Sequence, residues 1–166
     1  MKNKVFTEAL LKGRIGEYIF SSMLSESKNF SVIPFGHEYV FPSLLQHSSQ
    51  PDLKRLMKFI RKAPDFAVIN QIEKKVYLVE VKYQRRLDER RCYGIAKQLT
   101  NDWDPSWLFV CTRSGFFFSS CQDIVKNFGR MSRLTEQWVN DKLQREYLVL
   151  LNKSILDHSQ SSVDSE

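Results

Sequence analysis

The chain has 166 residues, of which 42% are hydrophobic and 27% are charged. This length and usage predict one globular domain, and they exclude a fully disordered chain, collagen or a low-complexity filament. The formal net charge is +6. Because three acidic residues and no Lys or Arg lie in the last ten positions, the rest of the chain carries a larger basic excess. That excess favours a polyanionic partner, either a nucleic acid or an anionic membrane surface.

Neither an export signal nor a membrane segment is expected. Glu8 and Lys12 interrupt the stretch that an export signal would keep apolar. The longest apolar runs are residues 107–111 and 148–151, far short of the roughly 20 residues that a membrane helix needs. The three cysteines form no C-x-x-C pair, and the three histidines lie at no zinc-ligand spacing beside them. We therefore expect a reduced cytoplasmic protein without structural zinc and without a membrane contact.

The first half of the chain begins with a long helix. Apolar residues at helical spacing, with no proline, predict this helix over residues 4–25. A short strand over residues 30–33 and an extended segment over residues 39–41 are expected to follow. The sequence Ser-Gln-Pro-Asp at residues 49–52 is typical of a helix start, and apolar residues then recur at i, i+3, i+4 and i+7 from Leu53.

The second half contains the remaining strands and two more helices. Two β-branched, apolar runs, residues 65–69 and 76–82, flank a polar segment and predict a β-hairpin. A helix over residues 87–102, which ends before a proline, is expected next. Two strands, 107–112 and 116–120, and a last helix, 134–151, complete the prediction. The fold class is therefore α/β, a mixed central sheet flanked by helices.

We expect a single domain over residues 1–156 and a disordered acidic tail over residues 157–166.

The predicted hairpin ends in Glu80-Val81-Lys82. Of the three E-x-K matches in the chain, this one closes a hydrophobic strand, so Glu80 and Lys82 project from one face and Val81 from the other. If the hairpin is symmetric about residues 72 and 73, paired residue numbers sum to 145 and Asp65 lies opposite Glu80. Two carboxylates at that distance repel each other unless a hard divalent cation binds between them. A metal, an attacking water and the Lys82 cation are the parts needed for phosphodiester hydrolysis.

The Pro-Asp pair ending at Asp65, followed by Glu80-Val81-Lys82, resembles the signature of the PD-(D/E)XK nuclease superfamily. That superfamily includes many restriction enzymes and Holliday-junction resolvases, and the resemblance runs over residues 4–120. It implies a restriction-endonuclease-like core. It also implies that the carboxylates of Asp65 and Glu80 and the carbonyl of Val81 hold Mg²⁺ or Mn²⁺, and that Lys82 assists the nucleophilic water.

Two further polar residues are candidates by the same resemblance. Many members add a glutamate from the first helix, and Glu17 in the segment Gly-Arg-Ile-Gly-Glu at residues 13–17 resembles it. Glu17 lies in line with Leu10 and Leu24, seven residues away on either side, which makes it a carboxylate on an apolar stripe. Both glycines of this segment would let the helix approach the sheet closely. Some members also carry a glutamine on the helix after the lysine strand, and Gln98 is the candidate.

Two basic clusters flank the predicted site. They are expected to bind phosphates of a nucleic acid, with Tyr83 and Gln84 lining the groove; the alternative is a pair of solvated helix faces. The first cluster precedes the aspartate and the second follows the lysine: Lys54, Arg55, Lys58, Arg61 and Lys62, then Arg85, Arg86, Arg90 and Arg91.

The sequence therefore predicts a metal-dependent nuclease that hydrolyses phosphodiester bonds. By analogy with the family, its substrate is DNA rather than RNA. Two alternatives remain open: a nuclease-fold module that binds nucleic acid or a protein without catalysis, and a cleavage subunit of a larger complex. The cleavage-subunit alternative arises because no separate recognition domain fits in this length, and a homodimer also remains open.

Overall fold

The computed structural model describes residues 2–36 and 51–160, with side chains for residues 7–36 and 55–156. The extended segment predicted over residues 39–41 lies outside the described residues. In chain order the elements are α1 (Lys2–Glu26), β1 (Phe30–Pro34), α3 (Pro51–Ile60), β2 (Phe66–Asn70), β3 (Lys75–Tyr83), α4 (Glu89–Asp102), β4 (Ser106–Thr112), β5 (Gly115–Ser120), α5 (Cys121–Lys126) and α6 (Asp141–Gln160).

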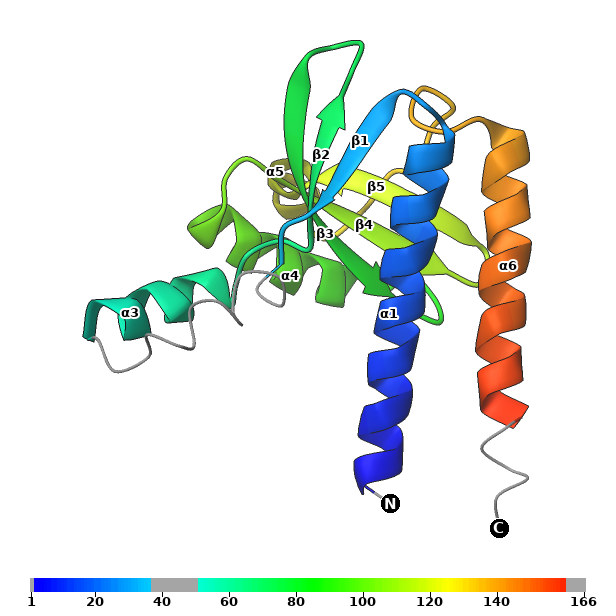
Figure 1. The fold of residues 1–166 in the computed structure, drawn as a ribbon, viewed down its shortest axis with the longest axis horizontal. Coiled ribbons are helices and arrows are strands. Elements are labelled where there is room, and N and C mark those ends of the chain that lie inside the picture. The colour runs from blue at the N-terminus through cyan, green and yellow to red at the C-terminus, as the bar shows by residue number, and fades with distance from the viewer. Residues whose placement is uncertain (1, 37–50, 161–166) are drawn as a thin grey trace.

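Within the described residues the strands form one five-stranded sheet in the order β1-β2-β3-β4-β5. The neighbours are antiparallel except β3 and β4, which are parallel and are joined through α4. Helices α1 and α6 lie side by side on one face, while α4 and α5 pack on the other (Figure 1). The predicted fold class, α/β with a mixed central sheet flanked by helices, is confirmed.

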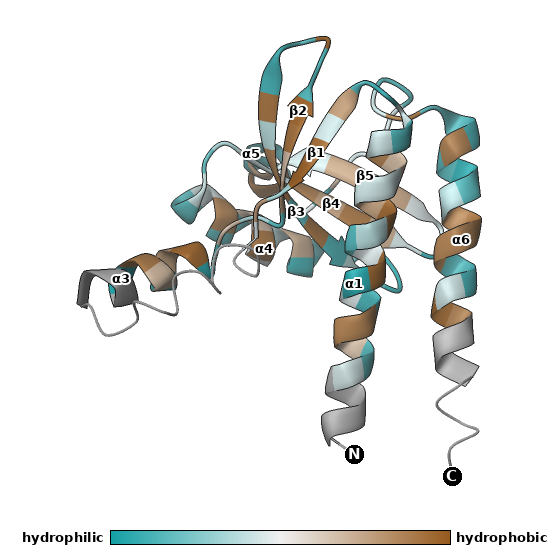
Figure 2. Cartoon of the chain, viewed as in Figure 1, coloured by the Kyte–Doolittle hydropathy of each residue, from teal (hydrophilic) through white to brown (hydrophobic). Residues whose placement is uncertain are grey.

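Each face of the sheet carries its own hydrophobic core, because side chains alternate along the strands. On the α1 face, the ring of Phe20 lies 5.3 Å from that of Phe66 and 4.7 Å from that of Phe109, measured between centroids. On the α4 face, Leu108 and Val110 of β4 are fully buried beneath the two helices. Figure 2 shows hydrophobic residues running through the central strands between these layers. Burying each large side chain contributes about 1.5–3 kcal/mol.

The last helix begins later than expected. It was predicted over residues 134–151, whereas α6 is Asp141–Gln160. Residues before it form a connection in which the Leu134 N–H donates to the carbonyl of Phe116 (2.9 Å) and Trp138 stacks on Phe30. Asn140 then starts the helix, since its side-chain oxygen accepts from the Leu143 N–H (2.9 Å). Residues 134–140, which were expected to form the start of the last helix, are therefore an irregular connection.

The end of α6 and the whole of α5 also differ from the prediction. Helix α6 continues to Gln160, into the segment expected to be a disordered tail, and residues 161–166 lie outside the described residues. Helix α5 was missed because it has six residues. It begins directly after β5, where the Ser120 hydroxyl accepts from the Asp123 N–H (3.1 Å). None of the helices in residues 2–36 and 51–160 combines the length and apolar character needed to cross a membrane.

Two glycines give opposite predictions for an added methyl group. Gly129 has φ +100°, and a Cβ there would lie 2.0 Å from the Glu89 carbonyl oxygen. Gly94 lies in the middle of α4 on its exposed side, and a Cβ there would contact no neighbouring segment within 4 Å. We expect Gly129→Ala to destabilise the fold by at least about 2 kcal/mol. Gly94→Ala, the matched control, should stabilise it by about 0.5–1 kcal/mol, because alanine restricts the unfolded chain. Urea unfolding of both variants measures the difference, and equal midpoints would contradict the close contact.

Candidate functional site

The hairpin register places the predicted residues together. The pairs of β2 with β3 run from Phe66↔Val79 to Asn70↔Lys75, and every pair of residue numbers sums to 145, as expected. Asp65 directly precedes the first of these pairs, so it lies beside Glu80. Strand β2 starts there, while β3 continues through residues 80–83 with β4 as its strand neighbour. The candidate side chains therefore lie where β2 begins and β3 continues beyond it.

Asp65 is fixed by hydrogen bonds at this strand end. Its Oδ2 accepts from the Val81 N–H (2.8 Å), and its main-chain carbonyl accepts from the N–H groups of Phe35 (2.9 Å) and Gly36 (3.1 Å). The carboxylate thus supplies the acceptor that a neighbouring strand would otherwise provide for the Val81 N–H. As a result, Asp65 connects the end of β1 to β3 and its side chain has a defined direction.

Glu80 and Lys82 lie on the same face of β3, as the strand period predicts. The Lys82 ammonium forms an ion pair with Glu80 Oε1 and lies 4.0 Å from Asp65 Oδ2. The side chains are mostly buried, with exposed fractions of 16% for Glu80, 25% for Asp65 and 33% for Lys82. Two acids and one cation therefore share a small, partly desolvated volume.

This clustering changes the proton affinities of the groups. Burial, together with the negative charge of Asp65, raises the pKa of Glu80 from 4.5 to about 7, although Lys82 acts in the opposite direction. Burial alone would lower the pKa of Lys82, but the carboxylates of Glu80, Asp65 and Glu17 outweigh it, and the pKa rises. Lys82 is consequently a permanent cation at neutral pH, suited to donating hydrogen bonds and not to accepting a proton.

Glu17 reaches the cluster from α1. Its negative charge raises the pKa of both Glu80 and Lys82, and its carboxylate pairs with Arg14 (3.2 Å). The helix comes close to β3 at Gly16, where a Cβ would lie 3.6 Å from Tyr83 Cβ. The same expectation for Gly13 was wrong, because no atom lies within 4 Å of its Cβ position.

A cavity of about 310 Å³ lies between α1, the end of β3 and the start of α4. Its walls include Tyr83 and Gln84, as expected, and one acid, Glu17. Four cations also line it: Lys12, Lys82, Arg85 and Arg91. The candidate site therefore opens onto a cavity with a positive charge excess, which favours an anionic ligand.

The second basic cluster is divided by the cavity. Arg85 and Arg91 lie in its walls, whereas Arg86 and Arg90 are exposed and outside the lining. All four precede or begin α4, whose first turn is capped by Asp88 accepting from the Arg91 N–H (3.0 Å). The structure therefore places half of this cluster beside Lys82.

The first basic cluster does not reach this cavity. Arg55, Lys58 and Arg61 are exposed on or just after α3, which projects from the body of the molecule (Figure 1), and the side chain of Lys54 lies outside the described residues. Lys62 forms an ion pair with Asp102 at the end of α4 (3.0 Å). That position is about 16 Å along the helix axis from Arg91.

The structure does not bring Gln98 to the site. Gln98 is exposed, on the side of α4 away from its buried residues Cys92, Ala96 and Leu99. The glutamine next to the lysine strand is Gln84, whose Oε1 accepts from the Asp88 N–H (2.7 Å). Gln84 was expected to line the groove, whereas Gln98 was the candidate on the helix, and only Gln84 lines the cavity beside Lys82.

The donor set fits a hard cation in part. Asp65, Glu80 and the Val81 carbonyl offer oxygen atoms, which Mg²⁺ and Mn²⁺ prefer. Among the residues with described side chains, no three His, Cys, Asp or Glu groups lie close enough to hold an ion together, so Glu17 does not form such a group with the other two acids. Mg²⁺ commonly uses one or two carboxylates and completes its shell with water and substrate phosphate.

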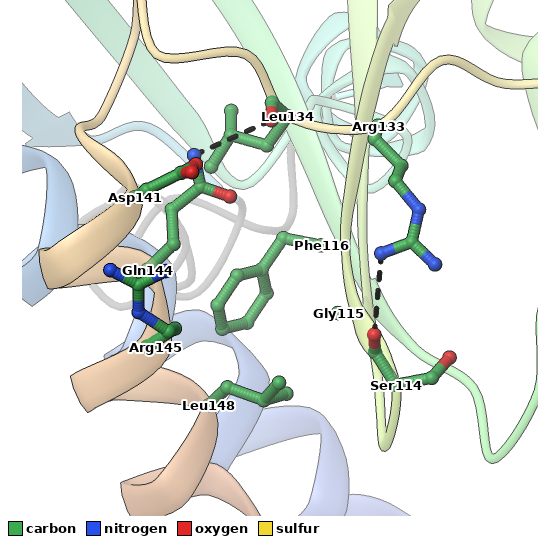
Figure 3. A pocket seen from close by; sticks show the side chains of 9 residues that line it. All are labelled: Ser114, Gly115, Phe116, Arg133, Leu134, Asp141, Gln144, Arg145 and Leu148. Atoms are coloured by element: carbon green, nitrogen blue, oxygen red, sulfur yellow. Dashed lines mark hydrogen bonds between the residues drawn. The ribbon is translucent and has the colours of Figure 1, made fainter.

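A second cavity, of about 240 Å³, lies between the β4–β5 hairpin and α6 (Figure 3). Arg133 donates to the Ser114 carbonyl (3.4 Å), and Gln144 donates to the carbonyls of Leu134 (3.4 Å) and Val139 (2.7 Å). Its polar groups thus hold the connection before α6 in place. The sequence analysis did not anticipate this cavity, since its walls come from segments far apart in the chain.

Comparisons with known proteins add no relative. No family model, no curated protein and no solved structure matches the chain. The interpretation of the site therefore rests on its own residues and geometry.

The raised pKa of Glu80 predicts a pH-dependent stability. Because the folded state binds this proton more tightly than the unfolded chain, the contribution of Glu80 is present below pH 4.5 and lost as the pH rises through about 7. Glu80→Gln cannot ionise, so in EDTA at pH 8 it should be more stable than the wild type by about 2 to 3 kcal/mol, with the difference shrinking toward pH 5. Denaturant titrations at both pH values measure this.

The control is Glu136→Gln, which changes an exposed glutamate and should alter stability by less than about 0.5 kcal/mol at either pH. A Glu80→Gln protein that is less stable than the wild type at pH 8 would show that the ion pair with Lys82 outweighs the desolvation of the acid.

Proposed function

We propose that the protein is a metal-dependent nuclease of the PD-(D/E)XK type, which hydrolyses phosphodiester bonds and prefers DNA. The observation that carries the proposal is the register that sets Asp65 beside Glu80, with Lys82 4.0 Å from Asp65. These residues are the ones that the sequence resemblance assigns to the reaction. Of these residues, Lys82 also lines a cavity with excess positive charge, which suits a polyanionic substrate.

In this proposal each residue has a separate task. Asp65, Glu80 and the Val81 carbonyl would hold Mg²⁺ or Mn²⁺, which when bound supplies a Lewis acid for the phosphate. The hydrogen bond from the Val81 N–H keeps Asp65 oriented before substrate arrives. Lys82 stays charged because three carboxylates surround it, so it orients the attacking water and stabilises negative charge on the phosphate.

The cavity beside Lys82 would hold the phosphate groups next to the bond that is cut. Lys12, Arg85 and Arg91 contribute cations to its walls from two different elements, α1 and the segment around the start of α4. Arginine binds phosphate with two parallel hydrogen bonds, which fixes the direction of the backbone. A strand bound there would run past Lys82, and Glu17 would limit how close its phosphates come to α1.

Cleavage assays test the reaction itself. The purified chain is incubated with plasmid, linear, single-stranded and four-way-junction DNA and with RNA, in Mg²⁺, Mn²⁺ or EDTA. We expect cleavage of DNA with either metal and none in EDTA. A wild type that binds nucleic acid but cuts nothing with either metal would refute the nuclease proposal in favour of the non-catalytic module.

Variants of the cluster separate metal binding from rate enhancement. Asp65→Asn and Glu80→Gln should lower both metal affinity and cleavage. Lys82→Ala should retain metal and DNA binding but lose roughly 100- to 1,000-fold in rate, the typical effect of one preorganised electrostatic contact. Lys75→Ala, an exposed lysine on the same strand, is the matched control and should cut like the wild type. Equal cleavage rates for Lys82→Ala and Lys75→Ala would show that Lys82 does not take part in the reaction.

Salt titrations test the cavity arginines. If Arg85 and Arg91 bind phosphates, the double substitution to Gln should weaken binding to all sequences and flatten the salt dependence by about 0.9 per lost contact. Lys142 and Arg145, two exposed cations on α6, give a control with the same change in charge when both become Gln. If the affinity of both double variants changes with salt concentration at the same slope, Arg85 and Arg91 do not bind phosphates and belong to a solvated helix face.

A further inference from the structure

The loop after α5 presents an aromatic side chain to solvent. Phe128 has an exposed fraction of 82%, the highest among the large hydrophobic residues with described side chains. Burying such a ring would contribute about 1.5–3 kcal/mol, which the folded chain forgoes at this position. A lone exposed hydrophobic residue is ordinary, so its significance depends on how it is held.

The backbone holds Phe128 in a conformation that its residue type disfavours. Its φ is +55°, in the left-handed region where helix ends normally carry Gly or Asn. Gly129 next to it also has a positive φ, and its N–H donates to the Ile124 carbonyl (2.8 Å). The N–H groups of Phe128 and Arg130 donate to the carbonyls of Val125 (3.3 Å) and Asn127 (3.2 Å). The ring is therefore displayed from a hydrogen-bonded loop.

The same loop is fixed against the wall of the basic cavity. A Cβ on Gly129 would lie 2.0 Å from the Glu89 carbonyl oxygen, so the two main chains are in direct contact. Glu89 begins α4 between Arg85 and Arg91, both of which line the cavity beside Lys82. Phe128 consequently stands next to the segment that carries the cavity arginines.

The segment that carries the ring has two exposed cations and no other exposed large apolar side chain. Lys126, the last residue of α5, and Arg130 flank it and are exposed, and residues 126–130 contain no acid, although the exposed Glu89 lies across the main-chain contact with Gly129. No other large hydrophobic residue in the described segments 85–95 and 121–133 is exposed. A protein interface would need a group of apolar neighbours, whereas one aromatic ring among cations is the arrangement that binds single-stranded nucleic acid.

We propose that Phe128 stacks on an unpaired base of a single-stranded nucleic acid, while Lys126 and Arg130 contact the phosphates on either side. This inference rests on the proposed nuclease function for the course of the strand, which would leave the cavity across the start of α4. It names a more specific substrate class: nucleic acid with a single-stranded segment, such as an end or a junction. Inside a duplex both faces of each base are covered by the neighbouring base pairs, so an internal paired base cannot stack on the ring.

Binding of a fluorescent 12-nucleotide single strand and a blunt duplex of the same length, in EDTA, tests the proposal. Phe128→Ala and Phe128→Leu should weaken single-strand binding by roughly 5- to 100-fold and lower the ratio of single-strand to duplex affinity. Phe128→Tyr, which keeps the ring, should bind like the wild type. Ile72→Ala, which removes another exposed side chain at the hairpin turn, is the matched control.

Charge and stacking are separated by salt. Arg130→Gln should flatten the salt dependence of single-strand binding by about 0.7, whereas Phe128→Ala should leave the slope unchanged. Single-strand binding by Phe128→Leu at the wild-type level would overturn the proposal, because an apolar side chain without a ring would then suffice. Concentration-dependent self-association that Phe128→Ala abolishes, with unchanged binding of the strand, would overturn it in favour of an interface between copies of the chain.

The two proposals fail separately. If the wild type cuts nothing in Mg²⁺ or Mn²⁺ but its single-strand affinity depends on the Phe128 ring, the nuclease function is refuted and the stacking surface stands. If the wild type cuts DNA while Phe128→Ala binds single strands as tightly as the wild type, the nuclease function stands and the stacking surface is refuted.

Discussion

The hydrogen bond from the Val81 N–H to the Asp65 carboxylate is the interaction on which the candidate site depends. Strand β2 begins one residue after Asp65, so among the described residues β3 has no strand partner on that side beyond Val79, and the Val81 N–H would lack an acceptor from a strand. A carboxylate at this point satisfies it and is held beside Glu80 as a consequence. An Asn could accept the same bond, but it would not supply the second negative charge. The site therefore arises from unequal strand lengths combined with one acidic residue.

The cluster itself does little to hold the fold together. Burying two acids and one lysine costs free energy, and the raised pKa of Glu80 shows that its charged form is disfavoured in the folded state. The stability must come from elsewhere, chiefly from the two apolar layers that α1 with α6 and α4 with α5 form on the sheet. Functional sites typically destabilise the fold in this way, because their geometry is kept at a cost in free energy that the hydrophobic core compensates.

The sequence was informative wherever the relevant geometry is local. The hairpin register follows from the turn position and the strand period, which is why Asp65 and Glu80 could be paired and Glu80 and Lys82 placed on one face. It was misleading where packing between distant segments decides: the apolar residues at 134–139 pack beside β5 instead of forming a helix, and Gln98 of α4 does not line the cavity beside Lys82. Neither the positive φ of Phe128 nor the contact of Gly129 with Glu89 was predicted from the residues around them in the sequence.

The segment from Lys82 to Arg91 connects these observations in physical terms. It leaves the sheet at the acid cluster, lines the cavity with Gln84, Arg85 and Arg91, and then becomes α4, whose first residue supports the loop of Phe128. Because the buried Gln84 and the cap at Asp88 hold this segment through hydrogen bonds, it has little freedom to move independently of β3. The main-chain positions that carry the cavity arginines and the loop of Phe128 are thus set relative to Lys82. A surface whose parts are ordered in advance loses less conformational entropy when a flexible strand binds across it.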